Sequence, residues 1–425
     1  MHNKNGLRLA VDIGGTFTDT VLVDGRGQIL ATTKTPTTPD NPTLGALDGA
    51  RRVLAEAAVD WSQIDGFIHG TTLATNALIE RRGAVVATVT TEGFRDILEI
   101  AYERRYSQYD INLVKPDLIV PRSRAFTIRG RIDARGRELE PLDEESLARL
   151  VVDLTASGAE AVAICLMHAY ANPAHELRLR DLLQARMPDL VISLSHEVSP
   201  EAREFDRLST TIANAYIQPQ MASYLADFQG RFSDKGLTCP ILMMTAGGGM
   251  TTIETAARLP IRLVESGPAG GAILAARIAA ETGEREVLSF DMGGTTAKLC
   301  LIDHFHPQSA RKFEIARAVR FIKGSGMPVR IPVIEMIEIG AGGGSIAHVD
   351  RLGRLLVGPE SAGSEPGPAT FAKGGTEPTV TDADVMQGLI EPGRFAEGRL
   401  AIDMKAAQVA LEQGVGQALG LDAAQ

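Results

Sequence analysis

Short apolar runs alternate with amphipathic stretches along most of the chain. Apolar runs at 7–11 and 20–24 and an alternating run at 28–34 predict three strands, and the apolar spacing of 44–58 predicts a helix after them. Further strands are expected at 64–68, 84–90, 126–133, 161–167, 190–194, 240–245, 286–290, 299–303, 333–339 and 346–349. Further helices are expected at 73–82, 91–100, 143–156, 174–186, 199–231, 272–280 and 404–419. This alternation predicts an α/β protein with mixed sheets and covering helices.

The helix expected at 199–231 carries a polar face whose role the spacing alone leaves open. Its start looks typical, with a capping serine, a proline at the first helical position and an acid in the first turn at 199–201. Polar residues then recur three or four positions apart, and they are Arg203, Arg207, Thr210 and Asn214. Such a face either lines a cleft or is solvated, and the spacing favours the solvated face.

Two glycine-containing turns have nearly the same sequence. Residues 12–19 read Asp-Ile-Gly-Gly-Thr-Phe-Thr-Asp, and residues 291–298, which start 279 positions later, read Asp-Met-Gly-Gly-Thr-Thr-Ala-Lys. Each stretch lies between two predicted strands and predicts a hairpin. Because glycine has no Cβ, a phosphate can approach the N–H groups of such a turn, and the aspartates suit Mg²⁺, which prefers oxygen ligands. A single Gly-Gly turn is common, but two copies favour one phosphate loop in each of two lobes.

A strand end followed by Gly-Thr-Thr and a helix start forms another candidate site at 68–77. Free N–H groups and the positive end of the helix dipole would then point toward a bound anion. The candidate residues are His69, Thr71, Thr72 and Asn76. The alternative is a helix capped by threonine with a packed histidine at the strand end, and the two interpretations of His69 weigh equally.

Residues 340–344 contain four glycines and lie between two predicted strands. Each glycine costs about 0.5–1 kcal/mol of extra chain entropy, so this run predicts a close backbone approach, with Gly342 and Gly343 as candidate substrate contacts. A separate group of tyrosines beside arginines at 102–109 fits either a polar pocket or an interface, and we favour the pocket.

The composition is that of a globular protein and excludes several classes. The 425 residues carry a net charge of −10, which argues against a nucleic-acid-binding surface. No run reaches the about 18 apolar residues of a membrane span, and the first strand begins too early for a secretory signal, so we expect a cytoplasmic protein. The three cysteines are far apart in sequence and are expected to be buried free thiols.

The motifs, taken together and in order, resemble the hydantoinase A/5-oxoprolinase family, a branch of the actin-like ATPase superfamily. The resemblance runs almost from end to end. The stretches that carry it are Val11–Asp19, His69–Ala77, Thr91–Asp96, Ser266–Ala269, Asp291–Thr295, Glu338–Ala347 and Gly374–Ala383.

The resemblance implies two ribonuclease-H-like lobes with mixed sheets around an ATP site. Their expected extents are 1–198 and 199–425, with the second lobe incomplete because family chains continue for a few hundred residues more. The implied catalytic and Mg²⁺-organising residues are Asp12 and Asp291. The implied ATP contacts are Gly14, Gly15, Thr16, Thr18, Gly293, Gly294, Thr295, Thr296 and Lys298. Many members carry Thr-Asp where this chain has Ala297-Lys298.

The activity that the resemblance implies is ATP-dependent opening of a cyclic amide such as hydantoin, N-methylhydantoin or 5-oxoproline. Phosphorylation of the amide oxygen would activate the ring for hydrolysis. The expected partner is a B-type hydantoinase subunit, in an oligomer. Two alternatives remain open: the ATP-using subunit of a ketone carboxylase of the acetone or acetophenone type, and a non-catalytic phosphate-binding remnant.

Overall fold

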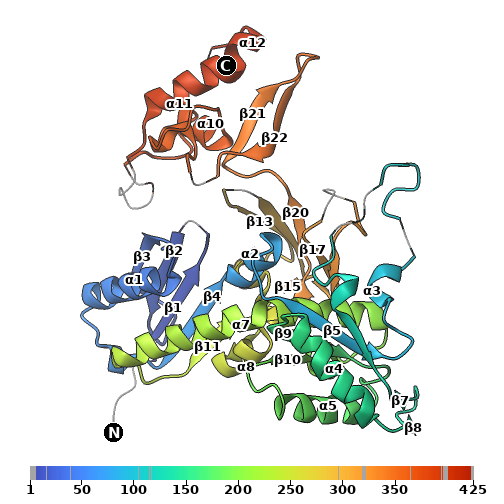
Figure 1. The fold of residues 1–425 in the computed structure, drawn as a ribbon. Helices are drawn as coiled ribbons and strands as arrows, with labels where there is room; N and C mark the ends of the chain where they lie inside the picture. Colours follow the sequence, from blue (N-terminus) through green and yellow to red (C-terminus); the bar gives the residue numbers. More distant parts are fainter. Residues whose placement is uncertain are drawn as a thin grey trace. The chain divides into compact units, whose positions relative to one another are not determined.

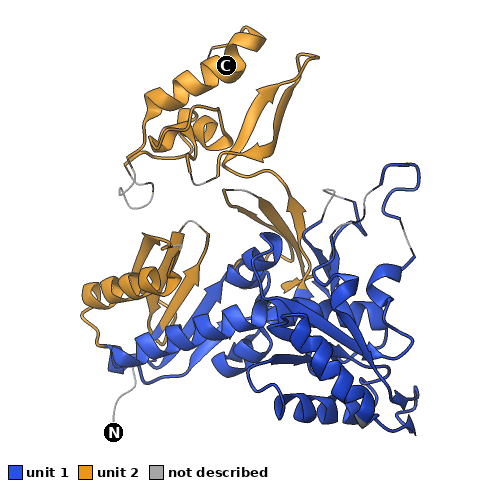
Figure 2. Cartoon of the chain, viewed as in Figure 1, with its two compact units in different colours: residues 1–8, 61–269, 309–333 blue, residues 9–60, 270–308, 334–425 orange. Residues whose placement is uncertain are grey.

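Contacts divide the chain into two compact units, and each unit is assembled from three segments of the sequence (Figure 2). Our computed structural model describes residues 6–15, 17–38, 40–103, 105–113, 115, 117–294, 296–317, 322–363, 365–393, 395 and 401–422. Unit 1 comprises residues 1–8, 61–269 and 309–333, and unit 2 comprises 9–60, 270–308 and 334–425. The boundary expected at 198/199 lies inside the 61–269 segment of unit 1, so the contact-based units are divided at other positions.

A parallel sheet in the order β10-β9-β5-β6 forms the centre of unit 1 (Figure 1). Its strands are β5 (Val86–Thr91), β6 (Ala125–Ile128), β9 (Ala161–Cys165) and β10 (Val191–Leu194). All residues of β5 and β9 are buried, as is typical of parallel strands covered on both faces. Helices α4 (Glu144–Ala156) and α5 (Ala174–Gln184) contribute leucines to the same core. Asp143 caps α4 by accepting from the N–H of Glu145, as the sequence predicts.

The other elements of unit 1 include a second parallel pair, β4 with β11, to which β12 adds antiparallel. The remaining strands are β4 (Gly66–Thr71), β7 (Arg131–Ile132), β8 (Glu138–Glu140), β11 (Ile241–Met244), β12 (Met250–Thr252), β16 (Ser309–Ala310), β17 (Phe313–Ile315) and β18 (Met327–Val329). The helices are η1 (Trp61–Gln63), α2 (Leu73–Ile79), α3 (Ile97–Ile100), η2 (Arg122–Arg124), α6 (Ser195–Val198), α7 (Glu204–Asp234), α8 (Ile253–Arg258) and η3 (Pro260–Leu263). The helix expected from residue 91 is thus reduced to α3, because β5 continues through Thr91.

The long helix α7 begins at Glu204, so the helix start predicted at Ser199 is wrong. Ser199 instead ends α6, and its hydroxyl donates to the carbonyl of Arg330, a residue far along the chain. The helix continues through Pro219 to Asp234 without a break. A tertiary contact has therefore displaced a helix start that looked favourable locally.

Three of the four residues on the predicted polar face are buried, so the solvated face is wrong for them, whereas Arg203 is exposed and precedes α7. Arg207, Thr210 and Asn214 are each 0% exposed. The Arg207 guanidinium donates to the Ser195 hydroxyl at 3.1 Å and to the carbonyl of Leu166 at 3.0 Å. Arg207 therefore bonds a hydroxyl and a carbonyl that follow the ends of β10 and β9. A buried polar side chain is tolerated when it is hydrogen-bonded in this way.

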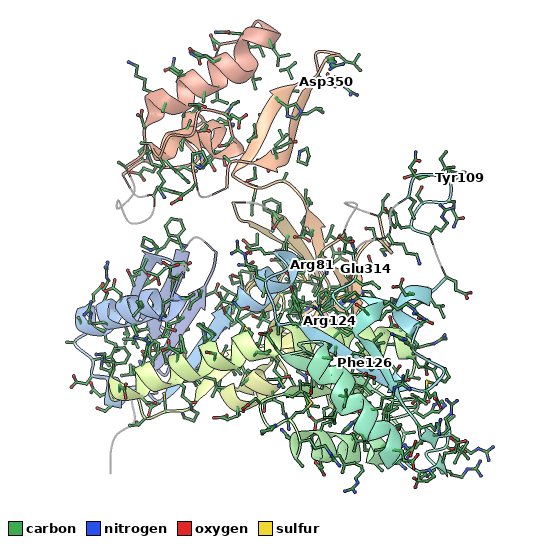
Figure 3. All side chains as sticks on the ribbon, in the orientation of Figure 1. Arg81, Tyr109, Arg124, Phe126, Glu314 and Asp350 are labelled. Carbon is green, nitrogen blue, oxygen red and sulfur yellow. The ribbon has the colours of Figure 1, made fainter. Side chains whose placement is uncertain are left out.

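The tyrosines at 102–109 do not gather in a pocket. Tyr109 is 96% exposed, and Figure 3 shows it at the outer end of its loop. Tyr102 instead bonds the buried carboxylate of Asp206 and lies under the ammonium of Lys312, 4.3 Å from the ring centre. The favoured pocket is therefore wrong, and Tyr102 belongs to an ion-pair network within unit 1.

Unit 2 contains the two sheets that the repeated motif predicts. One follows the order β1-β2-β3, with helix α1 against β2 and β3; the other follows β13-β14-β15, with β20 also paired to β14. Its strands are β1 (Arg8–Ile13), β2 (Phe17–Val23), β3 (Ile29–Pro36), β13 (Glu286–Met292), β14 (Ala297–Asp303), β15 (His306–Pro307), β20 (Ile337–Ile339), β21 (Ser345–Val349) and β22 (Leu355–Ser361). Its helices are α1 (Pro42–Glu56), η4 (Ala369–Phe371), α10 (Val380–Met386), α11 (Met404–Leu411), the π-turn η6 (Glu412–Gly416) and α12 (Gln417–Leu419). Three of the described elements cross the unit boundaries in sequence: β1 by its first residue, α9 (Ser266–Thr282) and β19 (Val333–Ile334).

All three cysteines are free thiols as expected, but only two of them are buried. Cys165 and Cys300 are buried and Cys239 is half-buried, and all three are free thiols. Burial raises the pKa of the Cys165 and Cys300 thiols, which disfavours the reactive thiolate. Within the described ranges, no helix is long and apolar enough to cross a membrane.

Candidate functional site

The first hairpin, β1–β2, closes on its two glycines. The N–H of Gly14 donates to the carbonyl of Phe17 at 3.0 Å. A Cβ at Gly14 would lie 3.0 Å from that oxygen, so the turn favours glycine there. Gly15 is exposed at the tip, and Thr16 lies outside the described residues. The expected turn is therefore present, with its second glycine open to solvent.

Thr18 supports this turn from the interior. It is 0% exposed, and its hydroxyl lies 3.1 Å from that of Thr37. The Thr37 hydroxyl donates its proton to the carbonyl of Gly14 at 2.9 Å, so Thr18 must donate to Thr37. Two hydroxyls thus link β2 to the first glycine, and neither Thr37 nor this link was predicted from the sequence.

The second hairpin, β13–β14, closes in the same way. The N–H of Gly293 donates to the carbonyl of Thr296 at 2.9 Å, which matches the bond between Gly14 and Phe17. Gly294 is exposed, and a Cβ built on it would meet no atom within 4 Å. Thr295, like Thr16, lies outside the described residues. The repeated sequence therefore forms a repeated turn.

The glycine-rich loop at 340–345 lies directly against the second turn. The N–H groups of Gly343 and Gly344 donate to the carbonyls of Gly293 and Gly294 at 2.9 and 2.7 Å. A Cβ at Gly343 would lie 2.6 Å from the hydroxyl oxygen of Thr381. The predicted close approach is confirmed, and its partner is the chain itself. Gly342 and Gly343, the expected substrate contacts, are buried here.

The leading aspartate of the first motif, Asp12, is affected by burial and by the charges around it. The surrounding protein withdraws water from the Asp12 carboxyl and raises its pKa, although part of the residue stays exposed. The negative charges of Asp19 and Asp291 raise it further, and the ammonium of Lys34 opposes them. The expected pair Asp12 and Asp291 therefore lies close enough for its charges to interact within unit 2.

Lys298 lies in the middle of a charged row across the second sheet. Its Cα pairs with that of Asp291 on β13 and with that of Glu338 on β20. Directly paired residues of antiparallel strands point to the same face, so these three side chains share one face beside the turn. Glu338 was not predicted as a site residue, although its place between two isoleucines indicates an alternating strand.

The candidates at 68–77 belong to unit 1, whereas both hairpins belong to unit 2. His69 is 0% exposed, stacks on Phe228 with 4.3 Å between ring centres, and lies 2.7 Å from the Tyr224 hydroxyl. Thr71 accepts from the N–H of Leu73 at 3.2 Å. Thr72 is the N-cap residue of α2, and its hydroxyl accepts from the Asn76 amide at 3.5 Å. For His69 the packed interpretation agrees with this burial.

Comparison with known proteins accounts for almost the whole chain. Sequence models of the hydantoinase/oxoprolinase N-terminal region and of hydantoinase/oxoprolinase match residues 8–187 and 207–425. The chain belongs to the hydantoinase/oxoprolinase family. Caprolactamase subunit alpha of Pseudomonas jessenii is 34% identical over 99% of this chain and 60% of its own length. The acetophenone carboxylase gamma subunit of Aromatoleum aromaticum is 34% identical over 97% of this chain and 57% of its own length.

Solved structures show the same mixed α/β fold for this hydantoinase/oxoprolinase chain. A nucleotide-free acetone carboxylase matches with a TM-score of 0.81 and 25% identity, over 98% of this chain and 59% of the other. The ATP-dependent caprolactamase of Pseudomonas jessenii matches with a TM-score of 0.80 and 33% identity, over 98% and 60%. The chain thus spans 57–60% of the length of these relatives. The expected family and the mixed α/β fold are confirmed.

Proposed function

We propose that this chain uses ATP to open a cyclic amide, as the A-type subunit of a hydantoinase-like enzyme. The observation that carries the proposal is the repeated turn, which gives unit 2 two identically closed Gly-Gly hairpins whose leading aspartates interact. Two such hairpins suit a triphosphate, because each presents an exposed glycine, Gly15 or Gly294, to an approaching anion. Family membership and an ATP-dependent relative support this choice of ligand.

The residues of the site also fit Mg²⁺. Asp12 and Asp291 provide the hard oxygen ligands that this ion prefers. Among the described residues, no group of three or more His, Cys, Asp or Glu side chains could hold a metal without help. Mg²⁺ is commonly held by one or two carboxylates together with substrate phosphates, so the two aspartates suffice. When bound, the ion would neutralise charge on the phosphates.

The proposed reaction begins with transfer of the γ-phosphoryl group to the amide oxygen, with ADP as the leaving group. Water then adds to the activated carbon, the ring C–N bond breaks, and a second water hydrolyses the resulting acyl phosphate. For these steps the phosphates would be held by the exposed glycines Gly15 and Gly294 and by Lys298, while Gly14 and Gly293 close the two turns. The catalytic gain would come from positioning and charge neutralisation. Thr18 would hold the first turn in shape rather than touch the nucleotide, since its hydroxyl is committed to Thr37.

The test is phosphate release by the chain together with a B-type hydantoinase subunit. We expect ATP hydrolysis to rise when hydantoin, N-methylhydantoin or 5-oxoproline is added, with the ring-opened acid formed in proportion. A second subunit is proposed because the relatives are named as subunits, including caprolactamase subunit alpha. Failure to bind ATP by calorimetry, with the B-type subunit present, would contradict the proposal.

A second candidate is the ATP-using subunit of a ketone carboxylase. It is favoured by the acetophenone carboxylase gamma subunit, which is as similar to this chain as caprolactamase subunit alpha is, and by the fold match to acetone carboxylase. The same assay separates the two. ATP hydrolysis stimulated only by a ketone with bicarbonate would replace the amidase by the carboxylase.

A further inference from the structure

The two hairpins carry the same row of three charged residues, with the positions of one acid and one lysine exchanged. In the first sheet, Asp19 on β2 pairs with Lys34 on β3, and their charged groups lie 2.7 Å apart. In the second sheet the corresponding residues are Lys298 on β14 and Glu338 on β20. Because the turns close identically, each middle-strand residue occupies the same place relative to its turn.

The exchange alters the charge beside the leading aspartate of each motif. In the second hairpin the ammonium of Lys298 lies on the strand next to Asp291 and at the same register. In the first hairpin the residue in that place is Asp19, whose carboxylate adds to the negative charge around Asp12. The lysine of the first row lies one strand further away. One hairpin therefore places a carboxylate next to its leading aspartate, with its lysine on the strand beyond, and the other places an ammonium there.

We propose that this exchange divides the binding of magnesium nucleotide between the two hairpins, with Asp12 serving the metal ion and Lys298 serving the phosphates. The inference rests on the proposed function and deepens it. Neighbouring carboxylates suit a hard divalent cation, whereas a lysine ammonium is a compact charge that binds phosphate well.

Glu338 is the positioning residue for this lysine. It lies directly across the strand pair from Lys298 and is exposed on the edge strand β20. An ammonium has three donors, so a carboxylate can orient it and still leave donors for a phosphate. If the two residues formed only a surface pair, they would add about 0.2–1 kcal/mol to stability and would not affect nucleotide binding.

The test measures ATP affinity by calorimetry, once in EDTA and once with saturating Mg²⁺. We expect Lys298→Gln to weaken metal-free ATP binding about tenfold and to preserve the factor by which Mg²⁺ tightens it. Asp12→Asn should bind metal-free ATP as tightly as the wild type does, and Mg²⁺ should no longer tighten its binding. Glu338→Gln should weaken metal-free binding by a smaller factor than Lys298→Gln. Lys34→Gln, the matched change in the first row, should alter metal-free binding by less than about twofold.

The outcomes separate this inference from the proposed function. Wild-type protein that binds no ATP in either condition overturns both. If the wild-type protein binds ATP and Lys298→Gln keeps the wild-type metal-free affinity, only the division is overturned. The division is also overturned if Lys298→Gln and Asp12→Asn each lose metal-free affinity and Mg²⁺ tightening to the same extent. The double exchange Lys298→Asp with Glu338→Lys copies the first row. It should keep the free energy of unfolding near the wild-type value, while the metal-free affinity for ATP stays low. Recovery of that affinity would also contradict the proposal.

Discussion

The first and second hairpins have the same turn but are supported by different parts of the chain. In both, the N–H of the first glycine closes the turn, and the carbonyl of that glycine accepts a bond from outside the hairpin. For Gly14 the donor is the hydroxyl of Thr37, which Thr18 supports in turn. For Gly293 the donor is the N–H of Gly343, and the position equivalent to Thr18 is occupied by Ala297.

This difference shows which features the repeat retains and which it does not. The closure of the turn and the leading aspartate are common to both copies, as expected if both serve the phosphates. The supports are interchangeable, because any donor of suitable reach satisfies a glycine carbonyl. The charges beside the aspartates also differ, which is the basis of the unequal roles proposed above. The following experiments probe the shared features first and the differing ones afterwards.

The largest effect is expected from removing either leading aspartate. Asp12→Ala and Asp291→Ala should each reduce ATP turnover at least about 100-fold, because each removes charge stabilisation at the transferred phosphoryl group. Both residues are exposed, so the thermal unfolding midpoint should barely change. Steady-state phosphate release and circular dichroism measure the two quantities. Normal turnover in one of the variants would mean that only one hairpin serves the reaction.

The next effect separates packing from ligand approach in the second hairpin. Gly343→Ala places a Cβ 2.6 Å from the Thr381 hydroxyl and should lower the free energy of unfolding by about 1–3 kcal/mol in urea titrations. Gly294→Ala is the matched control, because its Cβ meets no atom within 4 Å. It should leave stability unchanged while weakening ATP binding. Normal ATP binding by Gly294→Ala would exclude a phosphate from that side of the turn.

A smaller loss of stability is expected from the support of the first hairpin. Thr37→Val removes the donor to the Gly14 carbonyl and the acceptor of the Thr18 hydroxyl, at a cost of about 1–2 kcal/mol in the free energy of unfolding. Thr37→Ser keeps the hydroxyl and should lose much less. Equal losses in the two variants would show that the methyl group of Thr37, and not its hydroxyl, supports the turn.

The smallest effect concerns the pH dependence of stability at Asp12. Because its pKa is raised, the folded protein keeps this proton over a pH range in which the unfolded chain has lost it. Stability from this residue therefore falls as the pH rises through the folded pKa. In EDTA, Asp12→Asn should be more stable than wild type at pH 7, by less than about 1 kcal/mol given solvent screening. The difference in stability should vanish at pH values below 3.8, the ordinary pKa of an aspartate. Lower stability of Asp12→Asn than of wild type at pH 7 would contradict this account.

The sequence predicted the features that depend on near neighbours. The two turns follow from their own residues, since glycine and the flanking strands suffice to form them. The start of α4 follows from the capping side chain of Asp143. Family motifs added the predictions of an ATP site and of roles for Asp12 and Asp291, and these stay predictions.

The sequence could not predict features that depend on distant contacts. Thr37 reaches Gly14 across 23 residues, and Ser199 is drawn away from a helix start by a carbonyl 131 residues later. Arg207 looked like a solvated residue, because nothing near it in sequence reveals the Leu166 carbonyl and Ser195 hydroxyl that satisfy it. Glu338 escaped notice for the same reason, since its importance comes from pairing with a strand 40 residues earlier.

The most direct test of the account is the stoichiometry of Mg–ATP binding by calorimetry, because the central claim is that both hairpins hold one nucleotide. We predict one ATP bound per chain, with Mg–ATP affinity reduced in Asp12→Ala and also in Asp291→Ala. Two ATP molecules per chain, or wild-type Mg–ATP affinity in either variant, would show that the hairpins act separately and would contradict the claim.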